Sequence, residues 1–303
     1  MLLSQMIFVP AALPSINHFH LLPIIVACLL PYILTFNAVR SSSSVITPGN
    51  HKRELERYPY DSILYHENQV CRSCQFRKPA RSKHCSICDV CVSKSDHHCV
   101  WLMNCVGKGN HVYFVGLMGA LGVMLSYGSL LAFSILQNTL QVEHSRMSPM
   151  HINERSWSKG LSWKEFFDAW TSAISQDIRV GAIGLLASFT APLSWAMFSY
   201  HIYLVWAGMT TNETAKWACW KDDISDGLVY KRSKTQRAGK TISSHWPAWT
   251  THHFHRELDL HERETVDGHR SQKEGWTQVH SIAELENLYD LGFWKNLWDL
   301  NPV

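Results

Sequence analysis

Residues 71–105 read CRSCQFRKPARSKHCSICDVCVSKSDHHCVWLMNC, and this stretch decides how the middle of the chain folds. It holds seven of the nine cysteines of the chain. Two pairs have the Cys-x-x-Cys spacing, Cys71 with Cys74 and Cys85 with Cys88. Three histidines lie among the cysteines: His84, His97 and His98. So many thiols and imidazoles in so short a segment indicate metal binding rather than an apolar core.

The number of ligands leaves two schemes open. A structural zinc site is tetrahedral and closed, so two such sites need eight ligands. Seven cysteines with one histidine supply that number and leave no cysteine over. Six cysteines with two histidines supply it as well, and they free one cysteine for chemistry.

The surroundings of the cysteines favour a reducing compartment over a secreted disulfide framework. Cys-x-x-Cys pairs in such a compartment are metal ligands more often than disulfides. The net charge of +3 is too small to indicate a nucleic-acid partner. Basic residues close to membrane spans instead set topology and meet anionic lipid. Five of them lie within the first part of the cluster: Arg72, Arg77, Lys78, Arg81 and Lys83.

Three stretches contain no Asp, Glu, Lys or Arg: residues 1–39, 112–141 and 180–212. An α-helix needs about 20 apolar residues to cross a bilayer. The sequence therefore predicts an all-α, multi-pass membrane protein. Between its spans lies a small zinc-stapled domain made of short β-hairpins and loops.

The expected organisation alternates membrane and polar segments. Prolines interrupt the first 14 residues, so we expect a stub there and a first span at Leu21–Val39. The polar stretch from about Lys221 to Gln278 predicts a solvated, partly disordered segment. The expected domains are residues 1–39 as membrane region, 40–111 as cytosolic cysteine-rich domain, 112–137 as a span, 138–179 as luminal loop with an interfacial helix, 180–209 as a span, and 210–303 as cytosolic tail.

The distribution of basic residues orients the spans. There are 11 Lys and Arg residues from position 40 to 111, five from 138 to 179, and 12 after 210. Segments rich in Lys and Arg stay on the cytosolic side of a membrane. We therefore expect the cysteine-rich domain and the tail to face the cytosol, separated by two spans.

Asp96, His97, His98 and Cys99 are the residues on which the two ligand schemes differ. A thiol of pKa about 8.5 is only a few per cent thiolate at pH 7, so a nucleophilic cysteine benefits from an adjacent base. A histidine oriented by a carboxylate supplies one. Asp96, His97 and Cys99 have the residue types of an orienter, a base and a nucleophile.

The full spacing from Cys71 to Cys105 is C-x2-C-x9-H-C-x2-C-x2-C-x4-D-H-H-C-x5-C. In this pattern the chain resembles the DHHC family of protein S-acyltransferases, the palmitoyltransferases. Further similarity lies in Thr47-Pro48-Gly49, in the T-T-x-E sequence from Thr210 to Glu213, and in the aromatic segment Asn287–Leu300. The last two are most similar to the fungal branch that acylates SNARE and other single-span proteins.

The resemblance implies a role for each matching residue. Cys99 would be the acylated nucleophile, with His97 as base and Asp96 as orienter. Thr210, Thr211 and Glu213 would pack the cysteine-rich domain against the membrane core, rather than form a polar cap at the C-terminal end of the last span; Asn287 and Tyr289 would dock the tail. One zinc ion would be held by Cys71, Cys74, His84 and Cys91, and the other by Cys85, Cys88, His98 and Cys105.

The resemblance also implies a reaction and its partners. Cys99 would take the acyl group from palmitoyl-CoA and pass it to cysteines of membrane-anchored, SNARE-like proteins at the endoplasmic reticulum, with two structural zinc ions as cofactors. The alternative is a membrane-bound zinc adaptor without catalysis, or an inactive truncated homologue. The family usually has four or more spans, so three spans and a stub lead us to expect a truncated or shortened protein.

Overall fold

The computed structural model describes residues 1–41, 44–147, 162–233, 252–256 and 276–302. The chain forms two compact units. A helical unit comprises residues 1–35 and 115–200, and a cysteine-rich unit comprises residues 36–114 and 201–303. Three helices begin in one unit and end in the other: α2 (Leu21–Arg40), α4 (His111–Met147) and α6 (Ile178–Trp206).

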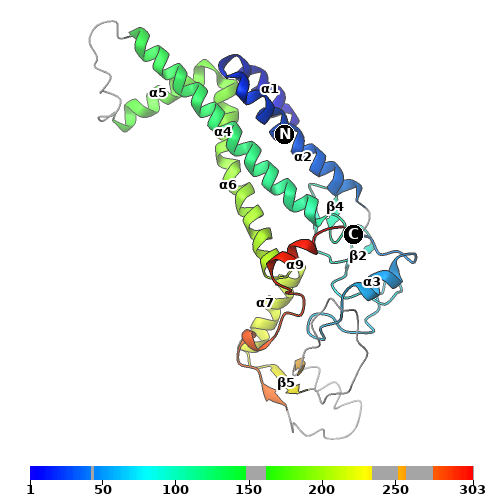
Figure 1. Cartoon of the computed structure of the whole chain (residues 1–303). Coiled ribbons are helices and arrows are strands. Elements are labelled where there is room, and N and C mark those ends of the chain that lie inside the picture. Colours follow the sequence, from blue (N-terminus) through cyan, green and yellow to red (C-terminus); the bar gives the residue numbers. More distant parts are fainter. Residues whose placement is uncertain (42–43, 148–161, 234–251, 257–275, 303) are drawn as a thin grey trace. The chain divides into compact units, whose positions relative to one another are not determined.

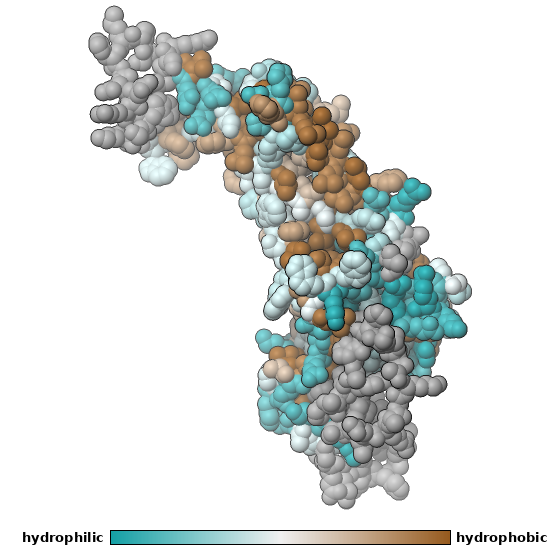
Figure 2. Space-filling model, in the orientation of Figure 1, coloured by the Kyte–Doolittle hydropathy of each residue, from teal (hydrophilic) through white to brown (hydrophobic). Residues whose placement is uncertain are grey.

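Within the described residues, three helices are long and apolar enough to cross a membrane: His18–Arg40, His111–Val142 and Ile178–Trp206. The helical unit also contains α1 (Leu2–Ala12), which is too short to span a bilayer. Large apolar side chains such as Leu3, Leu22 and Ile25 are exposed, and hydrophobic residues gather on α1 and α2 (Figure 2). An exposed apolar helix surface is suited to lipid. The predicted multi-pass membrane fold is confirmed.

The expected interfacial helix is α5 (Trp163–Gln176). Ser162 begins it with a capping box, in which Ser162 and Glu165 bond each other's backbone N–H. Trp163 and Phe167 are exposed on it. Exposed aromatic rings on a short amphipathic helix are typical of the headgroup region of a membrane.

Two helix ends differ from the sequence expectation. α4 continues to Met147, past the expected end at Gln137, because polar and charged residues end an apolar stretch without ending a helix. α6 ends at Trp206, before the expected residue 209. Gly208 has φ of 63°, a left-handed conformation that turns the chain out of the helix.

The cysteine-rich unit joins segments that are distant in sequence around one apolar core. This core combines Tyr58 and Leu64, which precede the cysteines, with Trp220, Val229 and Tyr289 from the tail. The elements of this unit are α3 (His51–Arg57), β1 (Lys83–Cys85), β2 (Val90–Val92), β3 (His97–Cys99), β4 (Asn104–Val106), α7 (Thr211–Ser225), β5 (Val229–Ser233), β6 (His252–Arg256), β7 (Thr277–Gln278), the 3-10 helix η3 (Ile282–Glu284) and α9 (Phe293–Trp298).

The tail carries more structure than its composition predicts. β5 pairs antiparallel with β6 on one side and β7 on the other, so the expected solvated, partly disordered segment is ordered at these strands. Residues 234–251 and 257–275 of that segment lie outside the described residues. Val229 and Val279 are fully buried and anchor the sheet. Backbone hydrogen bonds between the strands hold the polar residues of the sheet, and amino-acid composition gives no sign of these bonds.

Candidate active site

Two short hairpins carry most of the cysteine-rich stretch, β1 with β2 and β3 with β4. The central pair of each hairpin is a histidine opposite a cysteine, His84 with Cys91 and His98 with Cys105. Residues directly opposite each other in an antiparallel pair point to the same face. Each hairpin therefore presents one imidazole beside one thiol.

Two further cysteines complete each group, and the donor atoms of a group lie within 4.8 Å of one another. Nδ1 of His98 lies 3.3, 3.6 and 3.7 Å from the sulfurs of Cys88, Cys105 and Cys85. A tetrahedral zinc ion with ordinary bond lengths separates its sulfur and nitrogen ligands by about 3.6 Å. These donors therefore suit structural zinc. The groups are Cys71, Cys74, His84 and Cys91, and Cys85, Cys88, His98 and Cys105.

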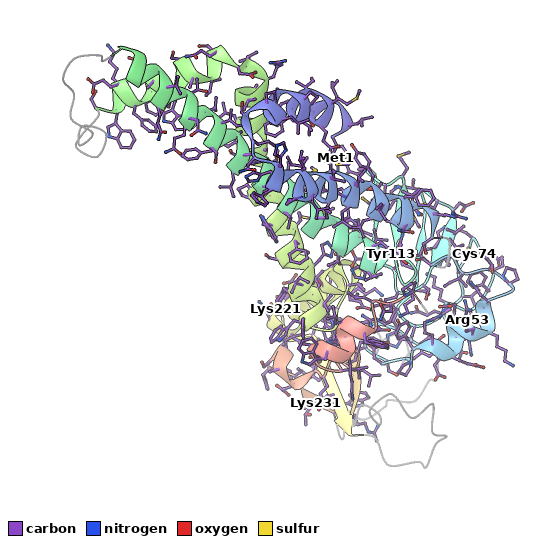
Figure 3. All side chains as sticks on the ribbon, turned by 45° about the horizontal axis from the view of Figure 1, so that its top comes forward. Met1, Arg53, Cys74, Tyr113, Lys221 and Lys231 are labelled. Carbon is purple, nitrogen blue, oxygen red and sulfur yellow. The ribbon has the colours of Figure 1, made fainter. Side chains whose placement is uncertain are left out.

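The two Cys-x-x-Cys turns share one local geometry, and Figure 3 labels Cys74 in the first of them. The N–H of Cys74 points at Sγ of Cys71 (3.4 Å), and the N–H of Cys88 at Sγ of Cys85 (3.5 Å). The residue after each turn is left-handed, with φ of 58° and 53°. Zinc takes its cysteines as thiolates, and an N–H directed at sulfur favours the charged form.

Strand β3 separates the Asp-His-His-Cys residues onto two faces. Side chains alternate along a strand, so His97 and Cys99 share the face opposite to His98. Oδ2 of Asp96 accepts a hydrogen bond from Nδ1 of His97 at 2.6 Å. A carboxylate only accepts, so Nδ1 carries the proton and Nε2 is left able to take one up.

Asp96 is buried and nevertheless ionised. Burial alone would raise its pKa, but the hydrogen bonds from His97 and from the N–H of Thr211 hold the pKa well below its usual range. The Thr211 N–H lies 2.7 Å from Oδ1, and the Thr211 hydroxyl lies 2.9 Å from Oδ2. Three donors thus fix this carboxylate.

The T-T-x-E residues begin α7 and do not cap the C-terminal end of the last span, so that alternative is wrong. Thr210 is the N-cap of α7, and its hydroxyl accepts from the N–H of Glu213 at 3.3 Å. Oε2 of Glu213 accepts from the N–H of Thr210 at 2.9 Å. The Thr-x-x-Glu spacing of this capping box is a sequence signal for a helix start.

Glu213 also holds Arg81, which the sequence shows only as one of several basic residues. Nε and Nη2 of Arg81 lie 2.7 and 2.6 Å from the two carboxylate oxygens of Glu213. Both side chains are fully buried. The Arg81 guanidinium lies 4.6 Å from the ring centre of Tyr289, in cation–π contact. Nothing in the sequence marks Arg81 as buried.

Asp299 is a second residue that the sequence does not single out. Its carboxylate accepts hydrogen bonds from Lys94 (2.8 Å), Lys108 (3.1 Å) and the hydroxyl of Tyr58 (3.0 Å). Burial lowers the pKa of Lys94 to about 8, although the charge of Asp299 opposes this. Asp299 therefore ties the tail to residues before β3 and after β4.

The predicted tail residues contact backbone carbonyls. Nδ2 of Asn287 donates to the carbonyl of Ala207 at 2.9 Å, just after α6. The hydroxyl of Tyr289 donates to the carbonyl of Pro59 at 2.8 Å. A Cβ added to Gly208 would lie 2.5 Å from Cα of Asp290, so only glycine allows this approach.

Two buried histidines lie close to His97. The ring centre of His201 lies 6.2 Å from that of His97. Phe114 packs edge-on against both, at 5.1 Å from His97 and 5.0 Å from His201. His111, the first residue of α4, lies 6.0 Å from His201. Figure 3 labels Tyr113 in the same turn of α4.

The apolar membrane helices and the cysteine-rich unit with its two Cys3His groups define a membrane-bound protein with a metal-binding domain. The chain belongs to the DHHC palmitoyltransferase family, which matches residues 64–218. It is a protein S-palmitoyltransferase, and the expected family, function and enzyme class are confirmed.

Curated relatives match almost the whole chain. It is 41% identical to palmitoyltransferase swf1 of Aspergillus fumigatus, over 97% of this chain and 81% of that protein. It is 40% identical to palmitoyltransferase swf1 of Emericella nidulans, over 98% of this chain and 75% of the relative. Palmitoyltransferase SWF1 of Saccharomyces cerevisiae is 29% identical, over 83% of this chain and 66% of that protein.

Proposed function

We propose that Cys99 is the acylated nucleophile of this palmitoyltransferase, with His97 as general base and Asp96 as its orienter. The observation that carries the proposal is the 2.6 Å hydrogen bond from Nδ1 of His97 to Asp96, which leaves Nε2 of His97 as the proton acceptor. His97 and Cys99 also share one face of β3. A base held in one tautomer activates a thiol for attack.

The reaction then has two steps. Sγ of Cys99 loses its proton to His97 and attacks the thioester carbon of the donor; a new carbon–sulfur bond forms, the old one breaks, and the leaving thiolate takes the proton. A substrate cysteine repeats the attack on the Cys99 thioester, which restores the free Cys99 thiol. One thioester replaces another in each step, so the enzyme contributes positioning and thiolate activation.

Both zinc ions are structural in this proposal. Each has four protein ligands and no open position, which is typical of a site that holds a fold together. Binding at such sites supplies on the order of 10 kcal/mol of folding free energy. The ions would fix the two hairpins and so the position of β3.

The T-T-x-E and tail residues are proposed supports rather than catalytic residues. Thr211 reaches Asp96 directly, whereas Thr210 and Glu213 start the helix that presents Thr211. Asn287 and Tyr289 dock the tail on backbone carbonyls. These contacts favour a role in orienting Asp96 and in closing the cysteine-rich unit.

We propose palmitoyl-CoA as the acyl donor. Its head carries phosphates, and the cysteine-rich unit has an open cavity of about 390 Å³ lined by Lys78, Lys83 and Lys216 together with Tyr60 and Tyr65. Lysines bind phosphate groups as point charges. Replacing Lys78 and Lys83 with glutamine should raise the KM for palmitoyl-CoA. An unchanged KM would place the head elsewhere.

The proposed acceptors are cysteines next to the single span of SNARE-like proteins, with the cysteine-rich unit on the cytosolic face of the endoplasmic reticulum. The similarity to the fungal branch and the distribution of Lys and Arg support this. Burial of an acyl chain is worth about 0.8 kcal/mol per methylene, so transfer must occur at a bilayer surface. Co-expression with single-span proteins, with and without their juxtamembrane cysteines, tests the acceptor class by acyl exchange labelling.

The decisive experiment compares Cys99→Ser with Cys219→Ser, a control at an exposed cysteine of α7. Purified proteins are incubated with a clickable palmitoyl-CoA analogue, and zinc is counted by mass spectrometry. We expect Cys99→Ser to lose hydroxylamine-sensitive label and to keep two zinc ions, and Cys219→Ser to keep both.

Loss of one zinc from Cys99→Ser would make Cys99 a ligand and overturn the scheme. Label that persists on Cys99→Ser would place the nucleophile elsewhere. Wild-type protein without any label would favour the zinc adaptor.

A further inference from the structure

A third cluster of metal-binding side chains lies outside the two cysteine groups. Asp96, His111 and His201 offer one carboxylate oxygen and two imidazole nitrogens, all within 4.8 Å of one another. Each of the three residues is at most 3% exposed. Two histidines and one carboxylate are a common donor set for divalent transition metals and leave coordination positions open for water.

The burial of the His111 imidazole without hydrogen bonds to its ring nitrogens is not explained by packing. Its ring is 1% exposed, and neither Nδ1 nor Nε2 has a hydrogen-bond partner within the described part of the chain. A buried polar group without a partner is costly and points to a bound ion or water. A phenylalanine would fill the same space without this cost, so packing alone does not account for the imidazole.

Asp96 keeps room for a further bond. A carboxylate has about four acceptor positions. His97 and the Thr211 hydroxyl use two at Oδ2, and the Thr211 N–H uses one at Oδ1. The remaining position on Oδ1 is available to a cation, and His111 and His201 supply the other donors.

We propose that Asp96, His111 and His201 form a third metal site, which binds Zn²⁺ reversibly and inhibits acyl transfer. The inhibition rests on the proposed roles of Asp96 and His97. A cation on Asp96 neutralises the charge that holds His97 in its working tautomer and that favours the imidazolium formed when His97 takes up a proton. The site has no thiolate, so it binds zinc more weakly than the two cysteine groups do.

The test uses full-length protein in detergent, equilibrated in zinc buffers of increasing free Zn²⁺. Zinc per chain is counted, and autoacylation by palmitoyl-CoA is measured at each concentration. In wild-type protein we expect zinc to rise from two to three ions per chain and autoacylation to fall about tenfold or more. His111→Phe and His201→Gln should stay at two ions, each with a rate that zinc does not change relative to its own zinc-free rate.

Two controls separate this proposal from the proposed function. His18→Phe, at an exposed histidine near α2, should bind the third ion like wild type. Cys99→Ser should also bind it, whether or not Cys99 is the nucleophile, because zinc counting does not need activity. Co²⁺ added to the two-zinc protein should give visible bands without thiolate charge transfer.

Three outcomes would overturn the proposal. The first is a wild-type protein that never exceeds two ions. The second is a third ion that persists in both histidine variants, and the third is charge transfer from cysteine to Co²⁺. A third ion that binds without slowing autoacylation would remove the inhibitory role.

Discussion

The two hairpins have the same architecture and different chemistry. β1 reads Lys-His-Cys and β3 reads His-His-Cys, and the central histidine of each faces a cysteine across the hairpin. The cysteine that follows differs in its surroundings: Cys85 joins the second metal-binding group, whereas Cys99 belongs to neither. The second hairpin therefore carries a cysteine that neither metal-binding group includes, and this is the thiol that we propose as the nucleophile.

The supports of the hairpins differ as well. Ser93, directly after β2, donates to the buried carboxylate of Glu54. Asp96, directly before β3, is held by the first residues of α7. The first hairpin is thus tied to a neighbouring short helix, and the second to a helix that follows the last membrane span. Only the second has a carboxylate placed to orient a base.

The largest effects should come from replacing each of the two adjacent histidines of β3 with alanine. His98→Ala removes a ligand, so we expect loss of one zinc and unfolding of the cysteine-rich unit, at a cost on the order of 10 kcal/mol. His97→Ala should keep both ions and lower autoacylation about 100- to 10,000-fold. Zinc counting, thermal unfolding and autoacylation distinguish the two. Equal zinc loss in both variants would contradict the assignment of the faces.

Arg81 lies shortly before β1, and its carbonyl accepts a hydrogen bond from the N–H of Ser95, shortly before β3. It therefore contacts the start of both hairpins. Arg81→Met leaves the buried carboxylate of Glu213 without its cation, which costs about 3–5 kcal/mol. We expect a large fall in the melting temperature. The double variant Arg81→Met, Glu213→Gln should recover part of it. A double variant no more stable than the single one would show that their pairing is unimportant.

Thr211 supports only the second hairpin. Thr211→Val removes the hydroxyl donor to Asp96 and keeps the backbone N–H, so we expect autoacylation to fall about tenfold to 100-fold, in line with a hydrogen bond to a charged group. Thr211→Ser should retain most activity. The zinc content of both variants should equal that of wild type. An active Thr211→Val would mean that the N–H alone holds Asp96.

Asp61 gives a smaller effect outside both hairpins. Burial raises its pKa to about 6; Oδ1 accepts three backbone N–H bonds, and Oδ2 has no hydrogen-bond partner among the described residues. A raised pKa contributes stability below the unfolded value of about 3.9, and this is lost as pH rises through about 6. Asp61→Asn should therefore raise the free energy of unfolding at pH 8 more than at pH 5, by about 1 kcal/mol, with a correspondingly larger rise in melting temperature at pH 8.

The zinc sites should lose stability as pH falls, because acid protonates the ligands and releases the metal. The two effects can therefore be separated by measuring zinc alongside unfolding. An equal shift of melting temperature at pH 8 and pH 5 in Asp61→Asn would show that Asp61 is not held ionised at the higher pH.

The sequence predicts the features that depend on residues close together in the chain. The cysteines and histidines of residues 71–105 predict eight zinc ligands, and the resemblance to the DHHC family implies the two groups in which the structure gathers them. The charge-free stretches predict the membrane helices. The start of α7 at Thr210 could have been found from its capping box. Short-range spacing carries this information because ligands and helix caps act within a few residues.

What could not be predicted depends on contacts between distant segments. Arg81 looks like the basic residues around it, and Glu213, 132 positions later, makes it part of a buried ion pair. Asp299 and His111 are likewise ordinary polar residues until the fold surrounds them. The sheet of the tail rests on backbone hydrogen bonds that carry no compositional signal.

The ion pair between Lys94 and Asp299 has a consequence for the order of synthesis. The two residues are 205 positions apart. At about 5–20 residues per second, a ribosome needs about 10–40 s to make the chain between them. For most of that interval both hairpins have already been synthesised, and Lys94 and Lys108 lack their carboxylate. The nascent enzyme therefore passes through a stage in which its thiol is made but its cysteine-rich unit is still open.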